Sequence, residues 1–420
     1  MAAESAGSWP GPPGGPDLPG VLGEVAGGEG VFADLAGQDA VVAQLRKAAQ
    51  AAARLLAGEP VTAGGMTHAW LFTGPPGSGR SVAARSFAAA LLCSDGGCGH
   101  CAACRQVRAG SHADLMVVRP DGLSYGVKQT RDLVLRAAGA PSGGRWRVVL
   151  FEDADRCTEQ AANALLKAIE EPAPRTVWLL CAPSAEDLVT TIRSRCRVVT
   201  LRVPSAGAVA AVLTTRDGID PERALVAAHA AQGHIGRARR LATDADARSR
   251  REQVLAVPGR ATSLGLALSA AAALVKTAEE EAKSVTEELD EPEREALRQA
   301  FGEGSTGKGV AKAVRGAAGA LRDLEDRQKS RATRLKRDSL DRALLDLAGF
   351  YRDVLMILAG AEVELANADH EPELRELASA SSPEATLHRM EAIMLCRERL
   401  AASVAPLLAV EEMTISLLAG

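Results

Sequence analysis

Aromatic side chains are scarce in this sequence, because Phe, Trp and Tyr together make up 3% of the 420 residues. Hydrophobic residues still reach 47%, so Ala, Leu and Val must build the interior, which favours packed helices over a β-sandwich. Long apolar runs are also lacking. No stretch approaches the ~18–20 apolar residues of a membrane-spanning helix, so we expect no membrane partner. The length predicts roughly two or three domains.

An excess of positive charge is missing too, because 49 Lys and Arg face 53 Asp and Glu and the net charge is −4. A protein that binds DNA alone is usually basic, so any contact with nucleic acid must be local or shared with partners. Residues 1–30 contain neither Lys nor Arg and lack the charged start of a signal peptide. We expect this segment to be a disordered Gly/Pro-rich tail, and the protein to be cytoplasmic.

Residues 31–204 alternate short apolar runs with helical patterns. Short buried strands separated by helices are typical of a parallel sheet covered on both faces, so we expect an α/β domain here. The five expected strands are Ala69–Thr73, Leu115–Arg119, Val148–Phe151, Val177–Cys181 and Val198–Leu201.

Beyond the expected sheet the patterns are helical. We interpret residues 205–250 as a small Ala-rich helical lid, residues 251–339 as a charged helical insertion or linker, and residues 340–420 as a C-terminal all-α domain. Within the insertion, an acidic stretch at 279–295 and a basic stretch at 315–337 flank a glycine-rich break. The pattern favours a pair of solvated helices, and a helix that contacts DNA or a partner is the alternative.

A glycine-rich loop follows the first expected strand. Residues 74–81 read Gly-Pro-Pro-Gly-Ser-Gly-Arg-Ser and match the phosphate-binding pattern G-x-x-x-x-G-K-[ST], except that Arg80 replaces lysine. The glycines would let backbone N–H groups surround phosphate oxygens at the start of a helix, and Ser81 would bind Mg²⁺. The residues expected to bind nucleotide here are Gly74, Gly77, Gly79, Arg80 and Ser81.

Two features predict weak or absent ATPase activity in the isolated chain. Arginine is longer, planar and forked, so Arg80 does not replace the compact lysine ammonium like for like. At the end of the third strand, Glu152 precedes Asp153, whereas an active site needs Asp to hold Mg²⁺ and then Glu to polarise water. ATP with Mg²⁺ remains a possible ligand of this degenerate site.

Four cysteines lie close together in the sequence: Cys93, Cys98, Cys101 and Cys104. Thiols stay reduced in the cytoplasm, so disulfides do not explain them. Four cysteine ligands in short loops suit tetrahedral Zn²⁺ and leave no open position for chemistry, which predicts a structural zinc site. Ordinary reduced thiols and an iron–sulfur cluster are the alternatives.

Taken in order, these motifs resemble the AAA+ clamp loader subunits of bacterial DNA polymerase III. The segment 32–38 looks like the entry segment that contacts adenine, and 68–74 resembles the start of clamp loader motor domains. The cysteine module and the run 163–172 (Asn-Ala-Leu-Leu-Lys-Ala-Ile-Glu-Glu-Pro) are particular to bacterial members. The resemblance implies an AAA+ P-loop sheet domain with a zinc module, a helical lid, and a C-terminal collar domain that forms oligomers.

The tripeptide Ser194-Arg195-Cys196 precedes the fifth expected strand. In the clamp loader family such a segment carries an arginine finger, which reaches the ATP phosphates of the neighbouring subunit and stabilises developing charge. The resemblance therefore implies that Arg195 acts in trans. A surface arginine without this role is the alternative, since Arg193 and Arg197 lie beside it.

Other elements of the family's motor subunits are missing. The fourth strand ends without the Thr or Asn sensor, and Gly236 stands where the lid sensor arginine would fall, with Arg237 one step away. These departures, together with an intact Arg195, match the non-motor, delta-prime kind of subunit. The resemblance implies gamma/tau and delta subunits as ring partners, and the sliding clamp and primer–template DNA as partners of the complex. An active gamma/tau-like motor and a zinc-stapled AAA+ scaffold outside replication are the alternatives.

Overall fold

The structure, a computed structural model, describes residues 30–62, 64–120, 122, 124–143, 145–300 and 310–419. The tail expected at 1–30 therefore lies outside the described residues apart from Gly30, and so does the glycine-rich break at 301–309. Within the described part of the chain, no helix is both long and apolar enough to cross a bilayer.

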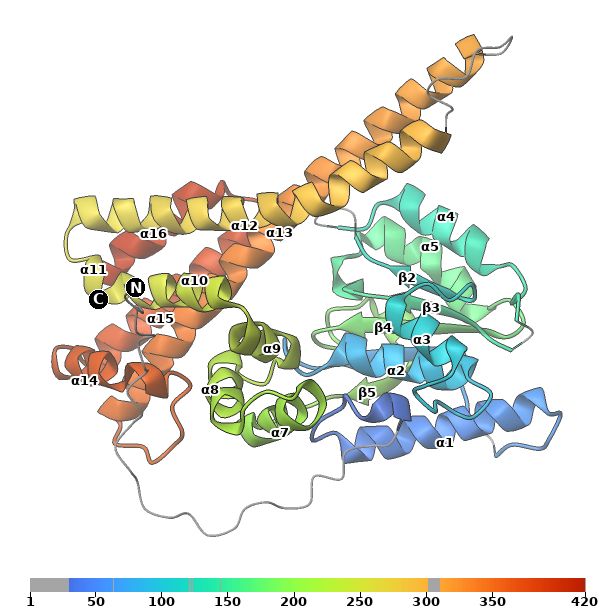
Figure 1. Cartoon of the computed structure of the whole chain (residues 1–420), viewed down its shortest axis with the longest axis horizontal. Helices are drawn as coiled ribbons and strands as arrows, with labels where there is room; N and C mark the ends of the chain where they lie inside the picture. Colours follow the sequence, from blue (N-terminus) through green and yellow to red (C-terminus); the bar gives the residue numbers. More distant parts are fainter. Residues whose placement is uncertain are drawn as a thin grey trace, which may run out of the picture.

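A five-stranded sheet forms the centre of the first part of the chain, and all of its strand pairs are parallel (Figure 1). The strand order is β2-β3-β4-β1-β5. This arrangement confirms the expected α/β fold class, and each expected strand is correct to within one residue at either end. The strands are β1 (Ala69–Thr73), β2 (Leu115–Val118), β3 (Arg147–Phe151), β4 (Thr176–Ala182) and β5 (Arg197–Thr200).

Helices cover both faces of this sheet and bury its strands. Alternate strand residues point to opposite faces, so Trp70 and Phe72 enter one core while Leu71 enters the other. On the first face Trp70 meets Phe87 edge to face, with ring centroids 4.9 Å apart. The first face carries α1 (Asp39–Leu56), α2 (Arg80–Leu92) and α3 (Ala102–Ala109); the second carries α4 (Val127–Ala137), α5 (Glu159–Glu170) and α6 (Thr190–Arg193).

The expected lid is a compact group of three helices: α7 (Ala206–Asp217), α8 (Pro221–Ala231) and α9 (Ile235–Thr243). Its core is mostly alanine, which lets the helices approach closely. The helices begin at ordinary caps, because Ser205 and Asp220 each accept a hydrogen bond from a backbone N–H of the first turn.

The C-terminal part is all helical, as expected. Leu344, Leu347 and Tyr351 are buried on one face of α13 (Val310–Leu358), whereas Leu355 is only half-buried. The domain boundary that we expected at residue 340 falls inside this helix. The helices are α10 (Ala245–Leu255), α11 (Val257–Arg260), α12 (Leu264–Ala300), α13 (Val310–Leu358), α14 (Glu371–Ser379), α15 (Pro383–Ala401) and α16 (Pro406–Ala419). The described residues also form three short 3-10 helices: η1 (Gly30–Phe32), η2 (Ala154–Arg156) and η3 (Ala368–His370).

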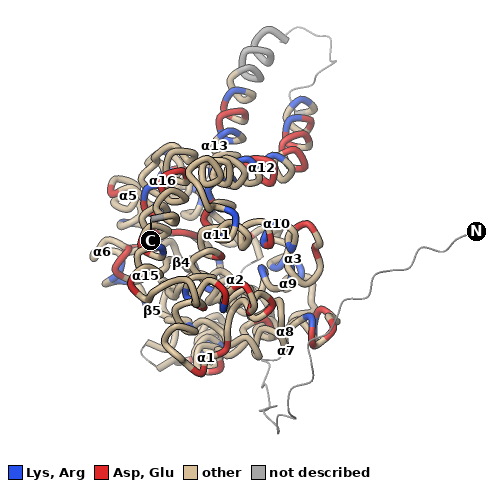
Figure 2. Tube along the Cα trace, turned by 90° about the vertical axis from the view of Figure 1, so that its left-hand side faces the viewer, with Lys and Arg blue, Asp and Glu red and all other residues tan. Residues whose placement is uncertain are grey.

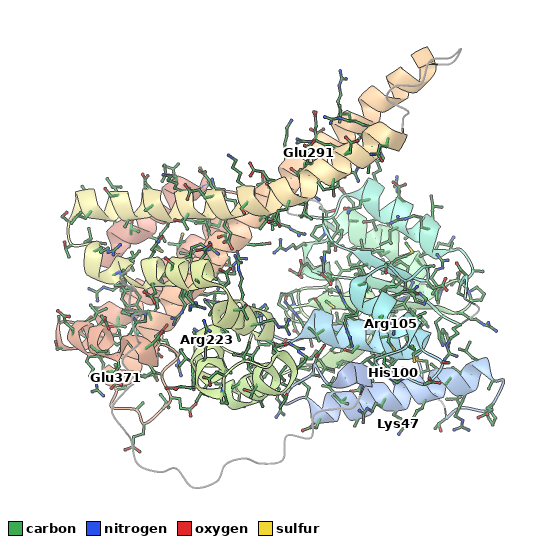
Figure 3. The ribbon with its side chains drawn as sticks, viewed as in Figure 1. Lys47, His100, Arg105, Arg223, Glu291 and Glu371 are labelled. Carbon is green, nitrogen blue, oxygen red and sulfur yellow. The ribbon has the colours of Figure 1, made fainter. Side chains whose placement is uncertain are left out.

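The acidic and basic stretches lie on α12 and α13, which run side by side and project past α4 (Figure 1). Both signs of charge appear on each helix of the projection (Figure 2), and Glu291 lies along it (Figure 3). The helices exchange ion pairs, of which Arg331 with Glu293 at 2.6 Å and Lys336 with Glu279 at 2.5 Å are examples. Acidic residues on one helix are thus matched by basic residues on the other.

Candidate functional site

The glycine-rich loop leaves the carboxyl end of β1 and turns directly into α2, as the phosphate-binding pattern predicts. Gly74 and Gly77 have φ angles of 148° and 88°, which L side chains rarely adopt. A Cβ at Gly74 would lie 2.6 Å from the Leu201 carbonyl oxygen, and one at Gly77 would lie 3.2 Å from the backbone of His234. The loop is therefore closely enclosed, and the lid lies directly against it.

Polar atoms converge at this loop with their hydrogen-bonding capacity unused. Among the described residues, Ser78 Oγ, Arg80 Nη1 and Asp155 Oδ1 are buried without a hydrogen-bond partner. Burial raises the pKa of Asp155, while the charge of Arg80 opposes this rise. Ser78 Oγ and Arg80 Nη1 are hydrogen-bond donors beside the N-terminus of α2. Such donors suit a phosphate oxygen, so the loop fits a phosphate group.

The end of β3 is arranged differently from a working Mg²⁺ site. Glu152 is 8% exposed, and its carboxylate is held by Arg119 at 2.6 Å and Arg85 at 3.2 Å. The hydrogen bond to Glu152 raises the pKa of Arg119. Tyr125 donates its hydroxyl proton to the Glu152 carbonyl oxygen, and Asp153 adopts a left-handed φ of 50°. A Mg²⁺ ion would have to displace two arginines from this carboxylate.

Sequence reasoning missed Arg85 and Arg119, because neither lies in a recognised motif. Arg85 is one turn along α2 from Ser81, and Arg119 is the residue after β2. With Ser81 and Glu152 they line a cavity of about 390 Å³, which also borders the cysteine module at Cys104. Of the expected nucleotide-binding residues, Ser81 and Glu152 thus meet at one cavity, but the Glu152 carboxylate is already paired with two arginines.

The lid side of the loop opens into a larger cleft of about 1230 Å³, lined by Pro75, Pro76 and Asp153 and by residues of the lid and C-terminal helices. Arg237, the lid arginine nearest to the expected sensor position, also lines this cleft, and its guanidinium pairs with Asp346 of α13. The arrangement therefore fits the binding of a phosphate group better than its transfer.

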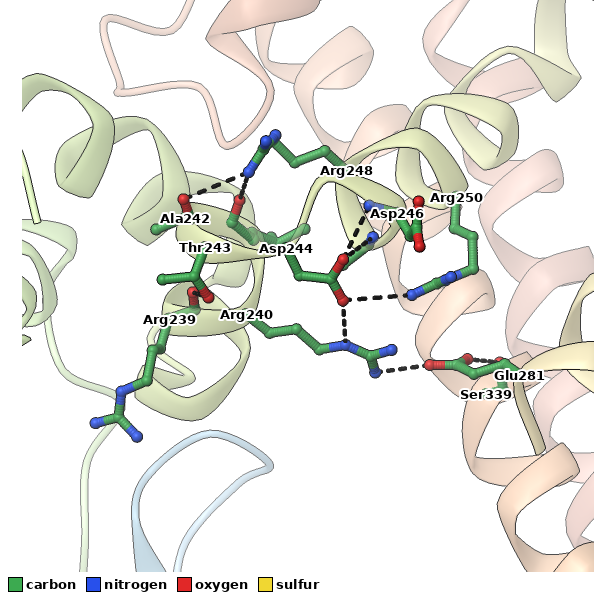
Figure 4. Close-up of polar contacts among 12 residues, drawn as sticks. Arg239, Arg240, Ala242, Thr243, Asp244, Asp246, Arg248, Arg250, Glu281 and Ser339 are labelled. Carbon is green, nitrogen blue, oxygen red and sulfur yellow. Dashed lines mark hydrogen bonds and ion pairs between the residues drawn. The ribbon is translucent and has the colours of Figure 1, made fainter. Parts of the chain in front are cut away.

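Further polar contacts join the lid to the C-terminal helices (Figure 4). Arg240 bridges Asp244 at 3.3 Å and Glu281 at 2.6 Å, and Arg250 approaches Asp244 at 3.6 Å. Ser339 donates a hydrogen bond to the same Glu281 carboxylate. These contacts tie α9 and α10 to α12 and α13.

Arg195 lies between α6 and β5, on the surface of the α/β unit. Its side chain is 40% exposed, and it pairs with Glu170 at 2.6 Å. Arg197 differs, because its guanidinium packs over the Trp70 ring at 5.0 Å and donates to the Gly64 carbonyl oxygen. Arg193 pairs with Glu186 at 3.6 Å. Of these three arginines, Arg197 is the one whose guanidinium packs within the α/β unit, between the Trp70 ring and the Gly64 carbonyl oxygen.

The four expected zinc ligands meet at the start of α3, beside α2. Their sulfur atoms all lie within 4.8 Å of one another, with Cys93 Sγ 3.8 Å from Cys98 Sγ and 3.6 Å from Cys101 Sγ. Tetrahedral Zn²⁺ with Zn–S bonds of ~2.3 Å would separate its sulfurs by about 3.8 Å. The cluster can therefore hold a metal ion. Figure 3 shows His100 and Arg105 at this module.

Backbone N–H groups point at the cysteine sulfurs. Gly99 N donates to Cys104 Sγ at 3.4 Å, and Cys104 N donates to Cys101 Sγ at 3.4 Å. Burial opposes ionisation of Cys93, but backbone hydrogen bonds outweigh it and lower the pKa of this thiol to about 7. Burial raises the pKa of Cys104, and the bond from Gly99 opposes this rise. Donors aimed at sulfur favour the thiolate form that binds metal.

Comparison with known proteins finds similarities that lie in the α/β unit. Residues 49–205 match the family described as "DNA polymerase III, delta subunit". DNA polymerase III subunit delta' of Pseudomonas aeruginosa is 42% identical over 148 residues, which are 34% of this chain and 45% of that protein. The delta' subunit of Bacillus subtilis is 36% identical over 135 residues, or 31% and 41% of the two chains.

Gamma/tau subunits match as well. DNA polymerase III subunit gamma/tau of Mycobacterium bovis is 36% identical over 169 residues, 39% of this chain and 27% of that protein. The matched stretch thus spans less than half the length of each of these three relatives. A gamma subunit-related protein from Thermotoga maritima is similar in structure, with a TM-score of 0.40 and 16% identity over 89% of this chain and 99% of that one.

The parallel sheet with its phosphate-binding loop defines the class of protein, an AAA+ P-loop protein. Over residues 49–205 the chain is similar to DNA polymerase III clamp loader subunits.

Proposed function

We propose that the chain is a non-motor, delta-prime-like subunit of the DNA polymerase III clamp loader. It would join a hetero-oligomeric ring with gamma/tau and delta subunits in the cytoplasm, through its C-terminal helices. The ring would open the sliding clamp when it binds ATP and release it on primer–template DNA after hydrolysis. In this proposal the chain contributes an arginine to the ATP site of its neighbour and does not hydrolyse ATP itself.

One contrast carries the proposal. The acidic residue of the chain's own site, Glu152, is buried and neutralised by two arginines, whereas Arg195 is exposed and held by one solvent-accessible carboxylate. A motor subunit needs the carboxylate at the position of Glu152 free to hold Mg²⁺. A subunit that acts in trans needs the guanidinium of Arg195 free to reach a phosphate. The chain's geometry supports the role of a subunit that acts in trans.

The test is the substitution Arg195→Ala in the full chain, reconstituted with the gamma/tau and delta subunits. Arginine fingers contribute ~10³–10⁵ in rate, so the DNA-stimulated ATPase activity should fall by orders of magnitude at the sites that Arg195 serves. Arg193→Ala is the matched control, because Arg193 is exposed to a similar degree but pairs with Glu186. An unchanged ATPase rate with Arg195→Ala would refute the arginine finger.

We propose further that the ion held by Cys93, Cys98, Cys101 and Cys104 is Zn²⁺ in a structural site. The sulfur separations and the thiolate-stabilising N–H groups support a closed tetrahedral site, and no fifth ligand is needed. The ion would fix α3 against α2 and so support the cavity that contains Glu152.

A motor role is the alternative that a specific observation favours, because a gamma/tau subunit matches the same part of the chain. ATP hydrolysis by the isolated chain, at rates typical of AAA+ motors, would support the motor. Failure of the purified chain to assemble with gamma/tau and delta would instead favour a scaffold outside replication.

A further inference from the structure

We propose that Glu170 is a positioning residue for Arg195, and that its carboxylate holds the guanidinium on the chain's own surface until an ATP phosphate of a neighbouring subunit replaces it. This inference rests on the proposed function. The juxtaposition that carries it is the 2.6 Å contact between Arg195 Nη2 and Glu170 Oε1, at the rim of the α/β unit.

The guanidinium is held at two points. Besides the bond to Glu170, Arg195 Nη1 donates to the Thr191 carbonyl oxygen at 2.8 Å and to Ser194 Oγ at 3.2 Å. Both nitrogens at the tip of the fork therefore have acceptors within the chain. A phosphate that approaches Arg195 must compete with the Glu170 carboxylate for Nη2, because this is the only charged acceptor among these contacts.

The position of Glu170 is fixed by the fold. It is the last residue of α5, and the residue before it, Ile169, is fully buried and accepts a hydrogen bond from His68 Nε2 at 2.8 Å. His68 directly precedes β1, so the end of α5 is tied to the central sheet. Glu170 therefore presents its carboxylate from a rigid point rather than from a loop.

The charge of Glu170 stands at an unfavourable place on its helix. The carboxyl end of a helix carries partial negative charge, which repels an acidic side chain and attracts a basic one. Arg195 relieves this repulsion. When it leaves, Glu170 regains an unfavourable interaction with α5, and this opposes departure of the arginine.

The contact is nevertheless exchangeable. The side chains of Arg195 and Glu170 are 40% and 42% exposed, and ion pairs in such positions contribute little to stability. A terminal phosphate carries more charge than one carboxylate and accepts a forked pair of bonds from arginine. ATP bound to a neighbour can thus displace Glu170. Before this exchange, Glu170 and the ATP phosphate compete for the guanidinium of Arg195.

The experiment uses the full chain reconstituted with gamma/tau, delta, the sliding clamp and primed DNA. Glu170→Gln keeps the shape but removes the charge, so the arginine is released more readily. We expect the KM for ATP to fall about two- to fivefold, the range that an exposed ion pair supports, with kcat changed less than twofold. Glu171→Gln is the matched control, because Glu171 is the next residue, is exposed, and should leave both constants unchanged.

A second variant separates contact from charge. Glu170→Asp retains the charge but draws the carboxylate back by one methylene, so it should lower the KM in the same direction as Glu170→Gln. Circular dichroism of each variant checks that α5 is intact. An unchanged KM in both variants overturns the inference, and so does a fall in kcat of tenfold or more, which would mean that Glu170 assists the transition state.

Failure of this inference is distinguishable from failure of the proposed function. If Arg195→Ala abolishes the ATPase activity while Glu170→Gln behaves as wild type, the arginine finger stands and only the role of Glu170 falls. If Arg195→Ala has no effect, both proposals fall. In the double variant Glu170→Gln/Arg195→Ala, activity should equal that of Arg195→Ala alone, because Glu170 acts only through the arginine.

Discussion

Arg237 of the lid pairs with Asp346 of α13, and the two side chains are 15% and 8% exposed. Arg251 of α10 approaches the same carboxylate at 4.0 Å and also pairs with Asp369 at 3.0 Å. A lid arginine that responds to ATP must face the phosphate loop, whereas this one faces the C-terminal helices. The contact joins the lid to α13 and occupies the guanidinium of Arg237 there.

The first prediction concerns this buried pair. Asp346→Ala removes the partner of Arg237 and leaves a poorly solvated guanidinium, so we expect the free energy of unfolding to fall by about 3 kcal/mol. Chemical denaturation followed by circular dichroism measures the change. Asp326→Ala lies on the same helix at a side chain that is 78% exposed, and should cost less than about 0.5 kcal/mol. Equal effects of the two substitutions would contradict the assignment of Asp346 to a structural contact.

The second prediction concerns the phosphate loop. The isolated chain should show weak or no ATPase activity, and Arg80→Lys should not restore it. The reason is that Glu152 remains held by Arg85 and Arg119, and Arg237 remains paired with Asp346. A phosphate-release assay on the purified chain tests both statements. Turnover at the rate of an AAA+ motor in either protein would show that these contacts do not silence the site.

Removal of metal is the third prediction. The purified chain should contain one Zn²⁺ per molecule by elemental analysis, and Cys101→Ser should lose it. Loss of the ion from this variant leaves three thiols and one hydroxyl in one small space without the metal that joins them, so the thermal transition should move to lower temperature and α3 should become sensitive to protease. Cys396→Ser is the control, because Cys396 lies in the C-terminal core and not in the cluster. Zinc retained at full stoichiometry by Cys101→Ser would contradict the ligand set.

Local patterns made the fold predictable. The strands were visible because each is a short apolar run that the sheet buries on both faces, as the residues of β1 and β4 show. The phosphate loop and the cysteine module were visible because their residues are neighbours in sequence. The run 163–172 shows a local pattern of the same kind in α5, where Leu165 and Ile169 are buried and Leu166 is half-buried.

Contacts between distant residues could not be predicted in this way. Arg85 lies 67 residues before Glu152, and Arg119 lies 33 residues before it, so no local pattern pairs them. The same holds for Arg237 and Asp346, which are 109 residues apart. The sequence shows that Glu152 and Asp153 stand in an unusual order, but only the fold shows which side chains pair with Glu152 and with Arg237. The ion pairs between acidic residues of α12 and basic residues of α13 likewise require the two helices to lie side by side, which no local pattern specifies.

The fourth prediction concerns pH and the junction between the lid and the helical pair. Burial alone would raise the pKa of Glu281, but the hydrogen bond from Ser339 and the charges of Arg342 and Arg240 outweigh it and lower this pKa from 4.5 to about 2. A carboxyl group with a lowered pKa in the folded state stabilises the fold above its unfolded pKa. Its contribution is therefore complete above about pH 5 and is lost as the pH falls from about 4.5 to about 2.

Glu281→Gln removes this dependence. We expect the variant to be less stable than the wild type at pH 7 by about 1–2 kcal/mol, since the side chain is 11% exposed and pairs with two arginines. The difference should shrink at pH 3, because Glu281 in the unfolded wild-type chain, with its pKa near 4.5, then binds a proton while the folded carboxylate stays largely ionised. Urea denaturation at pH 7, 5 and 3 measures it, and Glu280→Gln, at an adjacent side chain that is 65% exposed, is the control. A difference that stays constant from pH 7 to pH 3 would show that Glu281 stabilises the junction by packing alone and not by its charge.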